Sequence, residues 1–183
     1  DAILFTHSHA DHIMGLDDVR PFNFKQREVI PIFAAEDTLE AIKTSFRYIF
    51  RDNVGTATSL PKLDSTVLTG EPFDLFGLRF TPIPVIHGKS TIYGFRFGDA
   101  AYLTDHSEIP ESSLKLLRGL DVLFLDALRY KPHPTHSTVE RSLKYVELLT
   151  PRRAYFTPIC HSLQHKRPQR QRPPNVHLSS HGS

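Results

Sequence analysis

Three histidines and an aspartate lie within six consecutive positions near the start of the chain. The segment reads Thr6-His7-Ser8-His9-Ala10-Asp11-His12. As cations the imidazoles would repel one another, whereas as neutral ligands they can bind metal ions together with the carboxylate. A loop of surface histidines is the simpler alternative. The dense spacing at one point of the chain favours a metal site.

The residues around this segment explain how it is positioned. Ala2 to Phe5 form a short apolar run, which predicts a buried strand that ends just before the histidines and leads into a helix. Side chains alternate along an extended chain, so His7 and His9 are expected to point to the same side and share one ion. Asp11 and His12 follow the turn and are adjacent, so we expect them to diverge and reach a second ion or a metal-bound water. The segment therefore predicts a two-metal site.

The segment resembles the signature of the metallo-β-lactamase-fold hydrolases. Its continuation from Gly15 to Asn23 is similar to one branch of them, the phosphoribosyl cyclic phosphate phosphodiesterases and their relatives, and the resemblance covers nearly the whole chain. It implies an α/β fold of layered α+β type, the αββα sandwich. Several strands precede this motif in the family, so we expect residues 1–183 to form one partial domain, a fragment without its N-terminal strands whose first sheet exposes an edge.

The resemblance also implies which residues bind the metal ions. His87 ends a predicted strand and matches the third imidazole of the first ion, and Asp105 matches a carboxylate that bridges two ions about 3.5–4 Å apart. The resemblance gives the first ion the ligands His7, His9 and His87, and the second ion Asp11 and His12. A solvent-facing strand end for His87 and a helix N-cap for Asp105 are the alternatives.

Two residues receive catalytic roles from the same resemblance. Asp11 would orient the attacking hydroxide, and His136 matches the general acid. Ser137 and Glu140 predict a capping box directly after His136, and the positive end of a helix dipole there lowers the cost of a nearby phosphate and favours a neutral imidazole. His133 is a neighbouring decoy, and a plain loop histidine is the alternative for either one.

The C-terminal part departs from the family pattern. Pro158 stands where the resembling enzymes have a histidine that completes the second metal site, and Ser162 stands where an acidic residue is common. His161 or Cys160 is a candidate substitute ligand. We therefore expect a weak second site, while the predicted ligands of the first site are all present.

The predicted function is that of a metal-dependent hydrolase with two divalent ions. The N/O ligand set suits zinc or manganese. The resemblance implies a phosphodiesterase that cleaves a small, cyclic phosphodiester through a metal-bridging hydroxide. A tRNA 3′-processing nuclease is one alternative, although no long RNA-gripping insertion is visible. A metal-binding domain that is catalytically silent because of Pro158 is the other.

The composition bounds the class of protein. The chain has 183 residues, 39% of them hydrophobic and 23% charged, as expected of a globular domain. A single cysteine fits a reducing compartment, and no apolar run approaches the roughly 18 residues of a membrane span, so we expect a cytoplasmic protein without a membrane partner. A net charge of +2 is too mild to indicate nucleic acid, and the basic, proline-containing stretch 166–175 is expected to be a solvated loop. A small-molecule substrate and a homodimer are compatible with these features.

The remaining elements must hold the site residues in place. Two prolines, Pro82 and Pro84, predict that the strand before His87 lies at an edge or carries a bulge. Pro21 is expected to end a helix over 11–19, and Asp37 with Glu40 to cap a helix over 37–51. The other expected elements are a strand over 29–34, a hairpin of 92–97 with 100–103, a helix over 110–118, and strands over 121–125 and 154–156.

Overall fold

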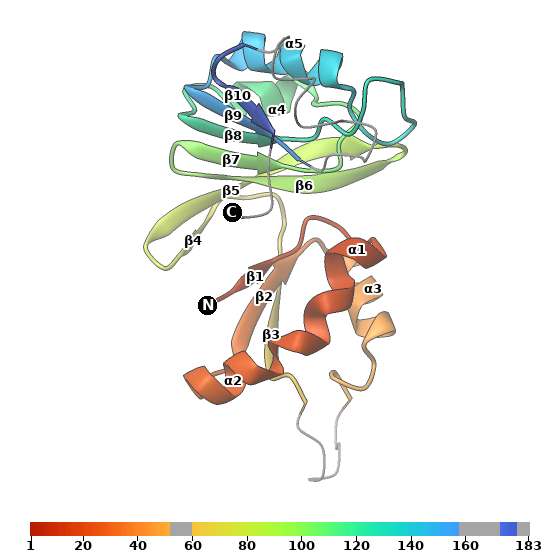
Figure 1. The fold of residues 1–183 in the computed structure, drawn as a ribbon. Coiled ribbons are helices and arrows are strands. Elements are labelled where there is room, and N and C mark those ends of the chain that lie inside the picture. Colours follow the sequence, from red (N-terminus) through yellow and green to blue (C-terminus); the bar gives the residue numbers. More distant parts are fainter. Residues whose placement is uncertain (52–59, 158–172, 179–183) are drawn as a thin grey trace. The chain divides into compact units, whose positions relative to one another are not determined.

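The computed structural model describes residues 1–51, 60–157 and 173–178. The chain divides into two compact units, Asp1–Thr69 and Gly70–Ser183, referred to below as the N-terminal and the C-terminal unit. Both units combine a β-sheet with helices, which confirms the predicted α/β class (Figure 1). The predicted Pro158 gap in the second metal site, the substitute ligand His161, and most of the 166–175 loop lie outside the described residues.

Residues 1–51 and 60–69 of the N-terminal unit contain a three-stranded parallel sheet and four short helical segments. The strands lie in the order β1 (Ile3–Leu4), β2 (Ile30–Ala34) and β3 (Leu63–Val67). The helical segments are α1 (Ala10–Ile13), the 3-10 helix η1 (Met14–Val19), α2 (Arg20–Gln26) and α3 (Glu36–Ser45). Apolar residues of the sheet and of these helices share one core, which contains Phe5, Ile13, Leu16, Ile32, Ala34, Leu39, Ile42 and Phe46.

Three local predictions in this unit are wrong. Pro21 does not end a helix but lies in the first turn of α2, where the missing N–H has no partner to lose. The helix α3 ends at Ser45 rather than 51, and its N-cap is Ala35, which has no side-chain cap. Asp37 instead accepts a hydrogen bond of 2.7 Å from the backbone N–H of Thr38.

The C-terminal unit is built on a seven-stranded mixed sheet. Its order is β10-β9-β8-β7-β6-β5-β4, with antiparallel pairs from β4 to β7 and parallel pairs from β7 to β10. The strands are β4 (Phe73–Leu75), β5 (Leu78–His87), β6 (Ser90–Phe97), β7 (Ala100–Leu103), β8 (Val122–Leu125), β9 (Arg153–Phe156) and β10 (Val176–Leu178). The helices α4 (Glu111–Leu116) and α5 (Val139–Leu149) lie together in Figure 1.

One face of this sheet forms the main core. Alternate residues of the central strands are fully buried and share a cluster with residues of α5 and of the end of α4. The members with no exposed surface are Ile83, Val85, Ala101, Leu103, Leu117, Leu123, Leu125, Ala127, Ala154 and Phe156. The core therefore fixes the central strands, whose ends carry the candidate site.

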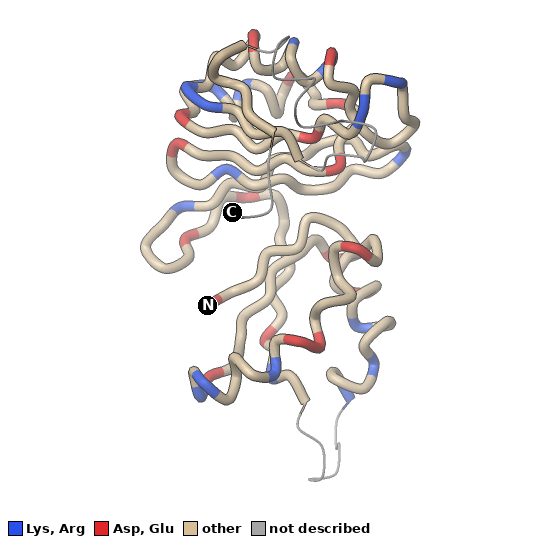
Figure 2. Tube along the Cα trace, in the orientation of Figure 1, with Lys and Arg blue, Asp and Glu red and all other residues tan. Residues whose placement is uncertain are grey.

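Charged residues of both signs are interspersed along the chain trace (Figure 2).

Strand pairing explains how β5 accommodates two prolines. β6 pairs with β5 from Phe80 to His87, whereas β4 pairs only with Leu78 to Phe80. Pro82 and Pro84 therefore lie where β5 has a named strand on one side only within the described chain. A missing N–H costs no ladder hydrogen bond on the open side, so the predicted edge character holds for this half of the strand.

Candidate metal and phosphoryl-transfer site

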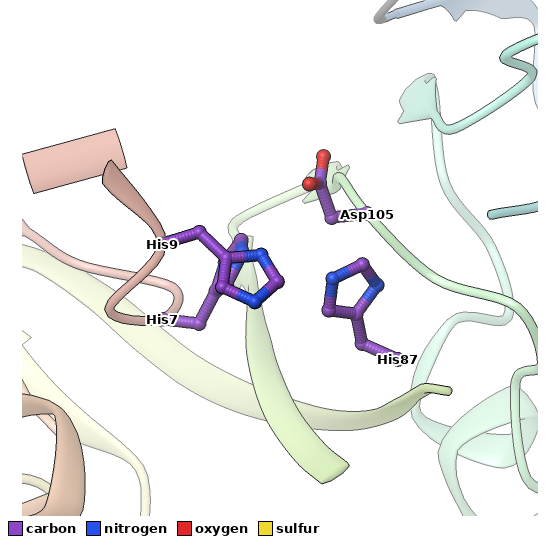
Figure 3. Close-up of side chains that lie close together, drawn as sticks. All are labelled: His7, His9, His87 and Asp105. Atoms are coloured by element: carbon purple, nitrogen blue, oxygen red, sulfur yellow. The ribbon is translucent and has the colours of Figure 1, made fainter. Parts of the chain in front are cut away.

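The histidines of the N-terminal unit gather where β1 ends and α1 begins. His9 is the N-cap residue of α1 and has an extended backbone, with φ −61° and ψ 149°. The ring centroids of His7 and His9 lie 4.5 Å apart, and those of His7 and His12 lie 4.2 Å apart (Figure 3 for His7 and His9). The imidazoles that were expected to share an ion thus lie side by side.

Asp11 and His12 do not diverge as expected. Asp11 Oδ2 lies 3.6 Å from His12 Nε2, although adjacent residues of a helix such as α1 do not usually face each other. The Asp11 side chain is 80% exposed, whereas that of His12 is 21% exposed. The pair thus brings a carboxylate oxygen and a ring nitrogen close together in this unit.

In the C-terminal unit, His87 ends β5 and is buried. Its Nδ1 lies 2.8 Å from the backbone carbonyl of Thr135, and because a carbonyl only accepts, Nδ1 donates. This hydrogen bond selects the tautomer in which Nε2 carries the lone pair. Metal-binding histidines are commonly held in this way.

Asp105 lies two residues beyond β7 and is also buried (Figure 3). Its backbone has φ +55°, a left-handed conformation that is uncommon for a residue other than glycine. The hydroxyl of Thr104 donates to Asp105 Oδ1 at 2.7 Å. Such a local backbone arrangement is often found at functional sites, where the surrounding structure holds it in place.

His136 lies beside Asp105 and is hydrogen-bonded to a second buried carboxylate, that of Asp126. Its Nδ1 is 2.7 Å from Asp126 Oδ2, and its Nε2 is 3.9 Å from Asp105 Oδ2. Asp126 has no exposed surface. Burial raises the pKa of the Asp126 carboxyl to about 6, although the hydrogen bond to His136 acts in the opposite direction. The carboxylate thus fixes which nitrogen of His136 faces Asp105.

The helix α5 and a neighbouring strand hold Asp126 in place. The backbone N–H of Asp126 donates to the carbonyl of Leu103 at 2.9 Å, and its Oδ1 accepts from the N–H of Leu128 at 3.1 Å. The Ser142 hydroxyl of α5 donates to the Asp126 carbonyl.

The predicted Ser137 cap is wrong, because Thr138 is the N-cap of α5 and its hydroxyl accepts from the N–H of Arg141 at 3.2 Å.

Asp126 had no predicted role, although the sequence contains a usable signal. Asp126 directly follows the apolar strand β8, and Asp105 lies two residues after β7. β7 and β8 are parallel neighbours in which Leu103 pairs with Leu125. The carboxyl ends of parallel neighbours lie at the same edge of a sheet, which is where ligands bind in open α/β sheets. The rule requires the strand order, which the sequence alone did not supply.

The C-terminal unit contains oxygen and nitrogen donors of the kind that bind divalent cations. Asp105, Asp126 and His136 each offer one atom, and these atoms lie within 4.8 Å of one another. Asp126 and His136 Nδ1 are already hydrogen-bonded to each other, so Asp105 is the better candidate ligand of the three. The oxygen and imidazole donors suit zinc or manganese better than thiophilic ions. The hydrogen bond that directs the Nδ1–H of His87 to a carbonyl is a further feature of a metal-binding imidazole.

Two other histidines lie nearby. His133 Nδ1 is 3.2 Å from the Thr135 hydroxyl, and its ring centroid is 5.0 Å from that of His136. Burial and the nearby His136 lower the pKa of His133. His106 is completely buried, and among the described residues neither of its ring nitrogens has a hydrogen-bond partner. Burial lowers the pKa of His106 to about 3, so it is neutral near pH 7.

Comparison with known proteins identifies the family. Residues 1–159 match the family described as the beta-lactamase superfamily domain. The chain belongs to this family. The crystal structure of a new diphosphatase from the PhnP family has 47% sequence identity and a TM-score of 0.90, over 100% of this chain and 70% of that one. The prediction of a metallo-β-lactamase-fold hydrolase that resembles this branch is confirmed.

Two further comparisons concern a protein of similar fold and a longer relative. The short form of human tRNase Z has 19% identity and a TM-score of 0.67, over 97% of this chain and 75% of that one, which shows a shared fold. A protein of Porphyromonas gingivalis named octanoyltransferase is 32% identical over 184 residues. That match includes 100% of this chain but spans only 37% of the relative, which is a much longer polypeptide.

The fold and the donor groups support a hydrolase that uses divalent metal ions. No helix in the described ranges is long and apolar enough to cross a membrane.

Proposed function

We propose that the protein is a metal-dependent phosphodiesterase that acts on a small, cyclic phosphodiester. The diphosphatase named above supports this choice within the superfamily, because it is 47% identical to this chain. We place the reaction in a cytoplasmic setting, with a small-molecule partner rather than nucleic acid.

The proposed ligands of the first ion are His7, His9 and His87, and those of the second ion are Asp11 and His12, with Asp105 shared between the two. Bound zinc or manganese would lower the pKa of a water molecule and neutralise charge on the phosphate. Asp11 would orient that water. The second site is proposed to be the weaker one, because Pro158 supplies no ligand atom.

His136 is proposed to protonate the departing oxygen. The observation that carries this role is the hydrogen bond of 2.7 Å from His136 Nδ1 to the buried carboxylate of Asp126. Because Asp126 accepts from Nδ1, the other nitrogen exchanges the proton with the substrate, and it faces Asp105 at 3.9 Å. Asp126 stabilises the protonated imidazole and fixes its orientation, as a carboxylate does in a hydrolytic triad.

The test compares diesters that have good and poor leaving groups. Bis(4-nitrophenyl) phosphate releases a stable phenolate, whereas adenosine 2′,3′-cyclic phosphate releases a basic alkoxide that needs a proton. His136→Ala should lower kcat for the cyclic phosphate by about 10²–10⁴ and for the aryl diester far less. Zinc content should be unchanged.

His177→Ala is the control, since His177 is an exposed histidine of the same unit whose ring packs on Tyr155 and which has no part in the proposed site. It should leave the ratio of the two rates near the wild-type value. An equal loss for both substrates in His136→Ala would remove His136 from the acid role. Rates that are the same with and without EDTA would refute a metal-dependent diesterase, and zero hydrolysis of either diester would leave a binding domain.

A further inference from the structure

The segment that carries His136 packs closely against the turn between β5 and β6. Gly88 occupies this turn with φ +64°, and a Cβ built on it would lie 2.8 Å from Thr135 Cγ2 and 3.9 Å from the Pro134 carbonyl oxygen. The first distance is shorter than two carbon atoms tolerate. Glycine at this position therefore lets the turn approach the segment 134–135 more closely than any other residue would.

A hydrogen bond joins the same two parts of the chain. The Nδ1–H of His87, the residue before Gly88, donates to the Thr135 carbonyl at 2.8 Å. His136 follows Thr135 directly and is bonded to Asp126. The ring centroids of His87 and His136 are 5.2 Å apart. The hydrogen bond from the proposed metal ligand His87 thus ends on the peptide group that links Thr135 to the proposed acid His136.

Thr135 has a second set of contacts that keeps its peptide in place. Its backbone N–H donates to His133 Nδ1 at 3.3 Å, and its hydroxyl lies 3.2 Å from the same atom. The segment has little regular structure of its own, since α5 begins only at Val139. The orientation of the Thr135 carbonyl toward His87 therefore depends on a small number of side-chain and packing contacts.

We propose that Thr135 is a positioning residue that couples metal binding at His87 to the placement of the acid His136. A cation on Nε2 of His87 requires the tautomer with a proton on Nδ1, and that tautomer is the one that binds the Thr135 carbonyl. Metal binding therefore orders the segment from His133 to Thr138. Linkage requires the reverse as well, so the docked segment raises the metal affinity. The proposal rests on the proposed function, through the assignment of His87 as a ligand.

The test separates the close contact from the strain of the glycine backbone. Gly88→Ala introduces a Cβ that collides with Thr135 Cγ2, and it also places alanine at positive φ. Gly77→Ala is the matched control, because Gly77 has φ +76° in another turn of the same unit and a Cβ there would meet nothing within 4 Å. Gly88→Ala combined with Thr135→Ser is the rescue, since serine lacks Cγ2 and keeps the hydroxyl that contacts His133.

Two measurements on the full chain report the coupling independently of turnover. The first is the zinc affinity in competition with a chromophoric chelator, and the second is amide hydrogen exchange of the peptide that contains residues 133–138, with and without zinc. In the wild type, zinc should slow this exchange. Gly88→Ala should weaken zinc binding by about 10–100-fold, the usual effect of losing an outer partner of a histidine ligand, and should abolish the slowing. Gly77→Ala should match the wild type, and the rescue should regain affinity and protection.

The wild-type exchange experiment decides the proposal even if Gly88→Ala does not fold. Zinc binding that leaves exchange of residues 133–138 unchanged would overturn the coupling and leave the proposed function intact. Equal zinc affinity in Gly88→Ala and the wild type would also overturn it. Failure to hydrolyse either diester, with zinc-dependent protection present, would count against the proposed function alone. Zinc that does not bind at all would count against both.

Discussion

Replacing His106 by leucine should remove a large part of the acid sensitivity of the fold. The imidazole has no exposed surface, its ring centroid is 5.9 Å from that of Tyr145, and burial lowers its pKa from 6.5 to about 3. The unfolded chain therefore binds a proton below pH 6.5, whereas the folded chain does not until about pH 3. Since the unfolded state takes up more protons in this window, stability is lost as the pH falls.

The size of the effect follows from the shift. A difference of one pKa unit corresponds to 1.36 kcal/mol, so the difference between 6.5 and about 3 is worth about 5 kcal/mol once the pH is below both values. Between pH 7 and pH 5 the His106 contribution should fall by about 2 kcal/mol. Leucine cannot titrate and removes two buried nitrogens that lack hydrogen-bond partners among the described residues, so its own cost should be small.

Urea unfolding at pH 7 and pH 5, in the presence of EDTA so that no metal contributes, measures the effect. The difference in the free energy of unfolding between the two pH values should be smaller in His106→Leu than in the wild type by about 2 kcal/mol. Leu117→Ala is the control, because Leu117 is fully buried in the same unit and does not titrate. It should lower stability equally at both pH values. The same pH difference in His106→Leu and the wild type would refute the assignment of a buried neutral imidazole.

Three further outcomes can be measured. Asp126→Asn should lower kcat for the cyclic phosphate by about 10–100-fold with unchanged zinc content, because a neutral amide stabilises a protonated His136 less than a carboxylate does; unchanged kcat would remove Asp126 from this role. Gly94→Ala should cost about 1–3 kcal/mol in urea unfolding, since its Cβ would lie 2.7 Å from the carbonyl oxygen of Tyr102, and a wild-type midpoint would contradict this packing. Thr138→Ala should cost about 1 kcal/mol by the same assay, as loss of an N-cap does, and zero cost would argue against this cap.

The sequence was most informative where a residue type and its position along one strand are sufficient. His87 and Asp105 were singled out by the family resemblance, which matches them to positions at or just after the end of a β segment, and the structure places both in buried positions next to His136. Their assignment as ligands stays a prediction. Asp126 was missed because its role depends on pairing between β7 and β8, which sequence periodicity does not specify.

Local capping was predicted less well, for a physical reason. Ser137 and Thr138 can both accept a hydrogen bond at a helix start, so the motif alone cannot choose between them. The structure uses Thr138 because the Ser137 side chain is fully buried, 2.8 Å from the hydroxyl of Ser142. Tertiary packing therefore determines which of the two residues is the N-cap, because their local propensities are similar.

The parallel pairing of β7 with β8 makes the candidate site sensitive to insertions in a position-dependent way. Asp126 faces His136 because Leu125 pairs with Leu103 and the backbone N–H of Asp126 donates a hydrogen bond to the Leu103 carbonyl. One residue inserted inside β8 would advance Asp126 by about 3.3 Å and turn its side chain to the opposite face of the sheet. An insertion beside Gly119, in the turn before β8, would leave the pairing unchanged. Insertions and deletions should therefore preserve the site when they fall in the turn before β8, and should disrupt it when they fall within the four residues of the strand.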